Sequence, residues 1–148
     1  MSREWESMYA RYRKAAGMTQ EHAAELMGVA VRSLAAWERG ESKPSDQRVL
    51  SMVDIYCAPT LAIEHLRATT AIAREVLPPV DAVPLPQAVC KLLSSIRTLE
   101  EIHAQDRLLQ IAADGRVDEI EAPEFGRLLE ELETVMCAVL AVKYAEGI

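Results

Sequence analysis

The sequence contains few aromatic residues, few glycines and few cysteines. Among its 148 residues, 5% are aromatic, six are glycine and three are cysteine. Hydrophobic residues still make up 50% of the chain, and Leu, Ala, Val, Ile and Met supply most of them. That composition favours helices over sheets and is too apolar for a disordered chain. We therefore predict a folded, all-α protein with room for one domain or two small ones.

The cysteines Cys57, Cys90 and Cys137 are odd in number and far apart. They lack the paired spacing that metal sites and redox motifs require, so we predict buried free thiols. The chain also lacks a long apolar run and a charged-then-apolar leader over residues 1–10. Spanning a bilayer takes roughly 20 apolar residues, so we expect a cytoplasmic protein with no membrane partner.

The sequence also lacks a catalytic constellation. Its three histidines are scattered, no serine or cysteine lies in a nucleophile motif, and there is no glycine-rich phosphate loop. A run of glutamates is most simply a solvated helix face: Glu124, Glu130, Glu131 and Glu133. We therefore predict no enzyme activity, no catalytic residue, no metal ligand and no cofactor.

Excess positive charge is missing too, because the formal net charge is −7. Residues 1–70 carry nine Lys or Arg and nine Asp or Glu, so residues 71–148 hold the whole excess. Four prolines lie within VLPPVDAVPLP, Val76 to Pro86, which favours a semi-rigid linker. We predict a domain over residues 1–75, a linker over 76–86 and a second unit over 87–148.

The sequence predicts five short helices within residues 1–75, the front unit. Their expected spans are Trp5 to Ala16, Thr19 to Met27, Val29 to Arg39, a helix starting at Pro44 and Ser45, and Thr60 to Ala68. Thr19 is a typical N-cap, while Gly17 and Gly28 are typical helix ends. The inward positions expected from helical spacing are Met8, Tyr12, Ala15 or Ala16, Ala23, Leu26, Met27, Val29, Leu34, Trp37, Val49, Leu50, Val53 and Tyr56. Two short helices joined by a tight glycine turn can lay the second helix in a DNA groove.

The run MTQEHAAELMGVAVRSLAAWERGESKP, Met18 to Pro44, resembles the lambda-repressor/Cro-like (Xre-type) helix-turn-helix family. The similarity lies in the spacing of Thr19-Gln20, Ala24, Gly28-Val29, Leu34, Trp37-Glu38-Arg39-Gly40 and Pro44. It covers about Tyr9 to Leu66 and implies a five-helix DNA-binding domain in a transcription regulator.

The resemblance also implies roles for individual residues. Arg13 and Glu38 match an ion pair between the first and third helices, which we interpret as structural. The expected DNA-binding residues lie at the start of the second helix, on the third helix and just after it: Thr19, Gln20, Val31, Arg32, Ser33, Ala36, Arg39 and Lys43.

These DNA-binding positions differ in what they can contact. Arg32 can bond bidentately to guanine, and Ser33 can bond a base or a phosphate. Val31 and Ala36 can meet only a thymine methyl, so direct readout rests mainly on Arg32, and specificity is expected to draw on a dimer partner and DNA shape. Arg39 and Lys43 are placed to meet phosphates or to remain solvated surface cations.

Two longer apolar periodicities follow the linker. The first runs through Val89, Leu92, Ile96, Leu99, Ile102 and Leu109, and the second through Phe125, Leu128, Leu132, Val135, Val139 and Val142. They predict two helices of about 25 residues in a long antiparallel hairpin. Further apolar residues widen its surface: Leu93, Leu129, Met136 and Leu140. We therefore predict a homodimer through the hairpin.

The connection ADGRVDEIEAP, Ala113 to Pro123, resembles the second half of an EF-hand calcium loop. Gln110 and Ala112 stand where the first oxygen ligands would be needed, so a structural turn is the favoured interpretation. A hairpin with such a turn after an Xre-type domain also resembles small regulators encoded by prophages.

One alternative remains open at this stage. The acidic rear half and the apolar Val31 and Ala36 also suit a protein-binding regulator of the antitoxin or antirepressor type. Such a protein would keep the helix-turn-helix fold with weak or no binding to double-stranded DNA.

Overall fold

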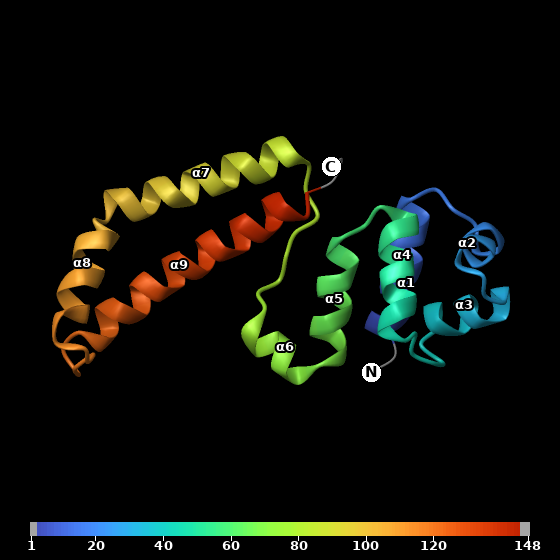
Figure 1. The fold of residues 1–148 in the computed structure, drawn as a ribbon, viewed down its shortest axis with the longest axis horizontal. Helices are drawn as coiled ribbons and strands as arrows, with labels where there is room; N and C mark the ends of the chain where they lie inside the picture. The colour runs from blue at the N-terminus through green and yellow to red at the C-terminus, as the bar shows by residue number, and fades with distance from the viewer. Residues whose placement is uncertain (1–2, 146–148) are drawn as a thin grey trace. The chain divides into compact units, whose positions relative to one another are not determined.

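The computed structural model describes residues 3–145, with side chains from residue 8 onward. The chain divides into two compact units, Met1–Pro79 and Val80–Ile148, and the division falls within the proline-rich stretch. The described residues form helices joined by turns and loops (Figure 1). The prediction of an all-α fold is therefore confirmed.

Unit 1 carries the five expected helices and a short additional one. They are α1 (Arg3–Ala15), α2 (Gln20–Met27), α3 (Val31–Glu38), α4 (Asp46–Tyr56), α5 (Thr60–Thr69) and α6 (Ala71–Val76). The helix α3 starts two residues later than expected, at Val31. The helix α6 was not predicted, and it ends at Val76, two residues before Pro78.

Side-chain caps and left-handed residues fix where these helices begin and end. The Thr19 hydroxyl accepts a hydrogen bond from the His22 amide at 3.2 Å, and Ser45 does the same for Arg48 at 3.4 Å. Gly28 ends α2 with a φ of 62°, a conformation that other residues adopt only with strain. The Thr19 N-cap and the Gly28 end are as predicted, and the fourth helix begins next to the predicted start at Pro44 and Ser45.

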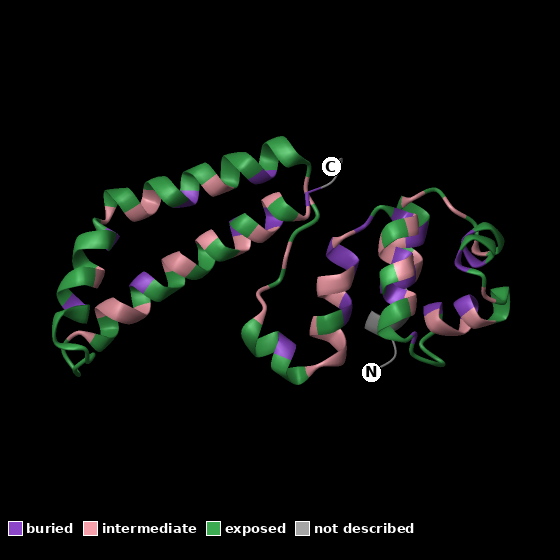
Figure 2. Ribbon diagram, viewed as in Figure 1, coloured by how far each residue is buried: buried purple, intermediate pink, exposed green. Residues whose placement is uncertain are grey.

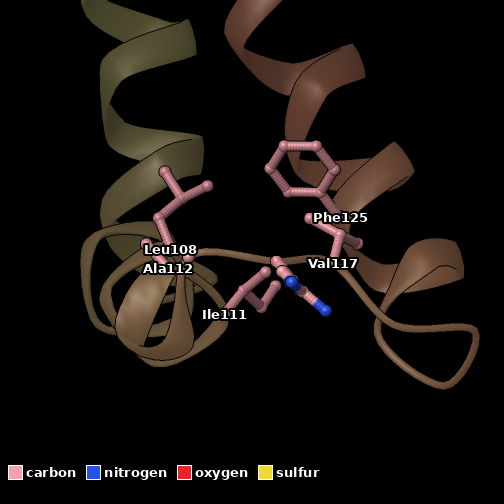
Figure 3. Close-up of a pocket in the computed structure, with 7 residues that line it drawn as sticks. Leu108, Ile111, Ala112, Val117 and Phe125 are labelled. Atoms are coloured by element: carbon pink, nitrogen blue, oxygen red, sulfur yellow. The ribbon is translucent and has the colours of Figure 1, made fainter.

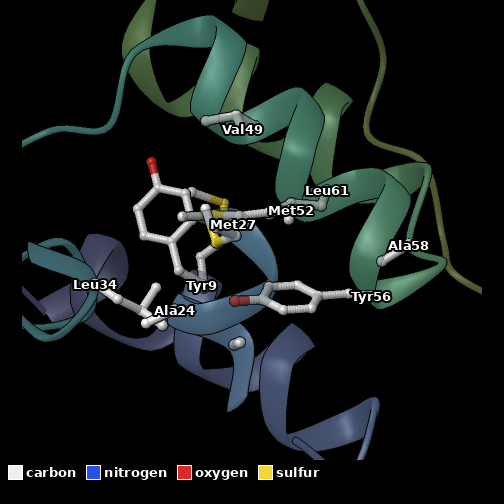
Figure 4. Packing of buried hydrophobic residues seen from close by; sticks show 11 residues of the cluster. Tyr9, Ala24, Met27, Leu34, Val49, Met52, Tyr56, Ala58 and Leu61 are labelled. Carbon is white, nitrogen blue, oxygen red and sulfur yellow. The ribbon is translucent and has the colours of Figure 1, made fainter. Parts of the chain in front are cut away.

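The core of unit 1 brings together side chains from α1, α2, α3, α4 and α5. In Figure 4, Tyr9, Met27, Met52 and Tyr56 point toward one another. Other fully buried members of this core are Met8, Ala23, Ala24, Leu34 and Leu61.

Two positions expected in this core are instead exposed. Leu26 and Leu50 are 52% and 50% exposed, because α2 and α4 turn Ala24 and Met52 inward in their place. Helical spacing left both choices open, and the small Ala24 allows closer approach of the neighbouring helices. Ala15 is exposed as well, whereas Ala16 packs against the core.

Unit 2 consists of α7 (Leu85–Glu101), α8 (Ala104–Ile111), a short 3-10 helix η1 (Ala112–Asp114) and α9 (Ala122–Lys143). The helices α7 and α9 lie side by side and antiparallel (Figure 1). The expectation of one 25-residue first helix is wrong, because the chain breaks at His103, whose φ is 54°. The helix α7 also starts inside the predicted linker, at Leu85.

The contact between α7 and α9 uses smaller side chains than expected. Ala88 and Ser95 are buried on α7, and Ala138 and Ala141 are buried on α9. Four residues assigned to the inward faces are exposed instead: Val89, Ile96, Leu109 and Val139. Figure 2 shows the resulting exposed outer sides of both helices. Small inward residues let two helices approach closely along this part of the contact, while the larger Leu128 is buried nearer the tip of the hairpin.

The cysteines differ from the prediction in burial. All three are free, but Cys57 and Cys90 are exposed and Cys137 is half-buried, so the expected burial is wrong. Within residues 3–145, no helix has the length and apolarity needed to cross a membrane.

Candidate nucleic-acid interface

The helices α2 and α3 are joined by three residues, Gly28 to Ala30. The left-handed Gly28 reverses the chain, and the Val29 amide then donates to the carbonyl of Ala24 at 3.0 Å. Arg48 of α4 braces the same turn, since its Nη1 donates to the Met27 carbonyl at 3.1 Å. The turn is therefore held from both the backbone and a side chain, which fixes the angle between the two helices.

One side of α3 is anchored in the core. Leu34, Ala35 and Glu38 are buried there, and Trp37 packs against the same core. At the N-terminus of the helix Val31 and Arg32 are exposed, and Arg32 points away from the anchored side by helical spacing. A short helix with one anchored side presents a fixed row of side chains outward, as groove recognition requires.

Buried charge links this helix to the rest of unit 1. The Arg13 guanidinium donates to both carboxylate oxygens of Glu38, with Nε to Oε1 at 2.5 Å and Nη2 to Oε2 at 2.9 Å. Its Nη1 also donates to the Met18 carbonyl at 2.6 Å. Hydrogen bonding to Glu38 raises the pKa of Arg13. The helices α1 and α3 and the connection after α1 thus meet at one hydrogen-bonded ion pair, which orients α3.

Gln20 also belongs to this cluster. Its Nε2 donates to Oε2 of Glu38 at 2.7 Å, a contact that the sequence did not suggest. An amide nitrogen carries two hydrogens, so one remains for a phosphate while the other is held by Glu38. The contact therefore aims the Gln20 amide and leaves it able to bond a phosphate.

The expected outward-facing residues differ in their surroundings. Arg32 is exposed and has no hydrogen bond or ion pair within the part of the chain that the structure describes. Ser33 and Ala36 are half-buried, and Val31 is 38% exposed. The N-terminal half of α3 therefore offers one cation beside small and apolar side chains.

Arg39 is held by a neighbour that sequence reasoning missed. Glu41 accepts from its Nε at 2.7 Å and from its Nη2 at 2.9 Å. The Arg39 hydrogen bonds lower the pKa of the Glu41 carboxyl, so this carboxylate stays ionised. Opposite charges two residues apart, just past the helix end, were the available signal. Any phosphate that binds Arg39 would have to displace Glu41. Lys43 is exposed on the same connection.

In the loop that resembles half of a calcium site, the carboxylates accept hydrogen bonds from the loop's own backbone amides. Asp114 accepts from the Arg116 amide at 3.0 Å, and Asp118 accepts from the amides of Ile120 and Glu121 at 2.8 Å each. In residues 3–145, no cluster of three His, Cys, Asp or Glu could hold a metal ion. These acids therefore have a structural explanation, because they form the turn into α9.

Comparison with known families supports the assignment of unit 1. Residues 10–56 match the family model described as helix-turn-helix, which spans about a third of the chain. No curated protein and no solved structure matches the chain in the same comparisons. The match covers α2, the glycine turn, α3 and all of α4, the elements whose geometry is described above. Residues 10–56 are therefore similar to the helix-turn-helix family, which supports a DNA-binding regulator in general.

Proposed function

We propose that this protein is a DNA-binding transcription regulator that places α3 in the major groove. The observation that carries the proposal is the exposed Arg32 at the start of a helix whose other side is anchored by the Arg13–Glu38 pair. An anchored helix holds its outward side chains at fixed positions, which base recognition needs.

The chemistry of the outward row suggests how DNA is read. Arg32 can donate two parallel hydrogen bonds to O6 and N7 of guanine. Val31 and Ala36 present methyl groups that fit beside a thymine methyl, and Ser33 can bond a base edge or a phosphate. Readout therefore depends on one polar residue with apolar support, so shape and deformability of the DNA contribute as well.

The residues around α3 would position the protein on the DNA backbone. Thr19 and Gln20 lie at the N-terminus of α2, where the exposed backbone amides and the helix dipole favour a phosphate. Arg39 and Lys43 follow α3 and supply positive charge. These contacts fix orientation and carry no sequence information themselves.

Affinity is expected to come from a homodimer formed by unit 2. Exposed apolar residues form an outer stripe on each helix: Leu85, Val89, Leu93 and Ile96 on α7, and Leu129, Met136 and Val139 on α9. On α7, Val89 and Ile96 directly follow the buried Ala88 and Ser95. On α9, Leu129 and Val139 directly follow the buried Leu128 and Ala138. Along an α-helix each residue points about 100° away from the one before it, and the sense of this rotation is the same in both helices. In antiparallel helices that offset places both stripes on one broad side, the dimerisation face.

The charge of unit 2 does not oppose this association. The exposed Glu130 of α9 falls on the opposite broad side by the same helical spacing. The charged residues beside the dimerisation face are two cations and two anions: Arg97, Glu100, Glu133 and Lys143. An apolar face with a mixed rim fits a second copy of itself.

The test compares Arg32→Ala with the wild-type protein on randomised and selected DNA. The variant should lose about 1–3 kcal/mol at the preferred site and relax base preference at one position. Arg11→Ala is the matched control, because Arg11 is an exposed arginine paired with Glu64 of α5. Wild-type protein that shows no salt-dependent DNA affinity would support the protein-binding alternative instead.

A further inference from the structure

We propose that unit 2 binds a small apolar carboxylate in a pocket at the tip of the α7–α9 hairpin. The pocket has a volume of about 370 Å³ and lies between α8, η1, the loop after η1 and the start of α9. That size falls within the roughly 300–1,000 Å³ typical of small-ligand sites. The site lies outside the helix-turn-helix domain and goes beyond DNA binding.

The walls of the pocket are apolar. Leu108 and Ile111 contribute from α8, Phe125 from α9, and Val117 from the loop (Figure 3). The neighbouring core of unit 2 has three buried residues, Ala104, Ile111 and Leu128, and Ile111 also lines the pocket. Val117 remains 43% exposed although it faces apolar neighbours. A hydrocarbon body in the pocket would cover this surface.

The loop that forms one wall is already held in place. Gly115 adopts a φ of 76°, and the Arg116 amide is fixed by Asp114 at 3.0 Å. The Asp118 carboxylate accepts from two amides of the next turn, while Glu121 accepts from the Asp118 amide at 3.2 Å. A wall held by its own hydrogen bonds loses little entropy when a ligand enters.

The charge of the pocket lining indicates which polar group the ligand carries. Arg116 is the only charged residue among those that line the pocket, and none of the lining residues is acidic. The nearby acids Asp114, Asp118 and Glu121 accept hydrogen bonds from the loop backbone instead. A guanidinium offers forked donors that match a carboxylate. The ligand class is therefore a hydrocarbon chain or ring bearing one carboxylate.

The experiment compares three probes of equal length: octanoate, octanol and octylamine. Binding to the full chain is followed by calorimetry and by NMR shifts of the methyl groups of Leu108, Ile111 and Val117. We expect octanoate to shift all three residues and to bind on the order of tenfold more tightly than octanol, because it gains a charge-assisted hydrogen bond. Octylamine should bind more weakly than either.

Two variants and one control make the result specific. Arg116→Gln should remove the preference for octanoate over octanol, and Ala112→Leu should fill the pocket and weaken both ligands. Arg127→Gln should change neither, because Arg127 is an exposed arginine of α9 that does not line the pocket.

Three results would overturn the proposal. They are no binding of octanoate by the correctly folded protein, tighter binding of octylamine, or methyl shifts that depend on protein concentration rather than on ligand. The last would show that a second copy of the chain occupies the pocket.

Discussion

At the level of single residues, the Arg13–Glu38 pair places opposite charges in an interior that offers little solvation. Both side chains are less than a tenth exposed, and every bond they make crosses between helices or reaches the α1–α2 connection. Such a pair adds little net stability, but removing one partner leaves the other charge buried. Its main effect is therefore on the orientation of α3.

Glu38→Gln should lower the free energy of unfolding by about 3–5 kcal/mol, since the Arg13 charge then lacks its counterion. The measurement is urea denaturation followed by the fluorescence of Trp37, which packs against the core. The double variant Arg13→Met/Glu38→Leu should recover most of this loss. A single variant that costs less than about 1 kcal/mol would contradict the buried-charge argument.

Stability should also depend on the protonation of His65. Burial lowers the pKa of His65 below its ordinary value of 6.5, more strongly than the nearby Asp46 carboxylate raises it. Tyr9 hydrogen-bonds to its Nδ1 at 2.7 Å, and Lys43 adds a small repulsion. The folded protein thus favours neutral histidine, and the unfolded chain binds the proton first.

The free energy of unfolding should therefore fall as the pH drops below 6.5 and level off below the folded-state pKa. Urea midpoints between pH 7.5 and 5.5 would show this slope. In His65→Gln the slope should be smaller, and in the exposed His22→Gln it should be unchanged. Equal slopes in all three proteins would refute a role for His65.

Glu41 should compete with the DNA phosphates for the Arg39 guanidinium. Its ion pair with Arg39 is exposed, and such pairs contribute little to stability because water and salt screen them. Glu41→Gln should therefore tighten DNA binding by about two- to fivefold, measured by fluorescence anisotropy. Glu75→Gln removes the same charge from α6 and should have little effect. Unchanged affinity in Glu41→Gln would mean that Arg39 does not meet a phosphate.

At the level of elements, the break between α7 and α8 is maintained at a conformational cost. His103 adopts a left-handed conformation, which is unfavourable by roughly 1–2 kcal/mol for a residue with a β-carbon. His103→Gly should stabilise α8 by roughly 0.5–1 kcal/mol, detectable as slower hydrogen exchange of its amides. His103→Ala keeps the β-carbon and should bring no such gain. Faster exchange in the glycine variant would indicate that the histidine ring itself supports the break.

The break between α7 and α8 could not be predicted from the sequence. Helix ends with a chemical cause could be predicted, as Thr19, Gly28 and Ser45 show, because a cap acts within a few residues of itself. His103 gives no such signal, since tertiary packing of α8 on α9 sets the conformation there. The short helix α6 was missed for a related reason, because six residues are too few for a clear period.

The face of each helix was harder to predict than its span. Where apolar residues lie at neighbouring positions, helical spacing does not decide which of them is buried. On α2, Ala24 is buried and Leu26 is not, and on α7 the buried residues are the small Ala88 and Ser95. Close packing of backbones decides such cases, and hydrophobicity alone does not express it. At the candidate interface, the family spacing pointed to Arg13 and Glu38, whereas the Gln20–Glu38 and Arg39–Glu41 contacts depend on side-chain geometry.

At the level of the whole molecule, charge and apolar surface are distributed unequally. The formal charge of −7 lies entirely after residue 70, so the helix-turn-helix domain is neutral and attracts DNA only weakly. Two such domains joined through a dimer would bind two half-sites together, and the second contact would be intramolecular. Linking of this kind can raise affinity by about 10²–10⁴-fold without new contacts.

Leu93→Glu places a charge in the centre of the dimerisation face, where the wild-type side chain is 59% exposed in the single chain. We expect the variant to be monomeric in sedimentation equilibrium at micromolar concentration, and its affinity for a two-half-site DNA to fall about 10²-fold or more. Its affinity for a single half-site should not change, because unit 1 is intact. Ser94→Glu adds the same charge on the opposite, polar side of α7 and should remain dimeric. A monomeric wild-type protein, or a Leu93→Glu protein that still dimerises, would place the source of DNA affinity outside this face.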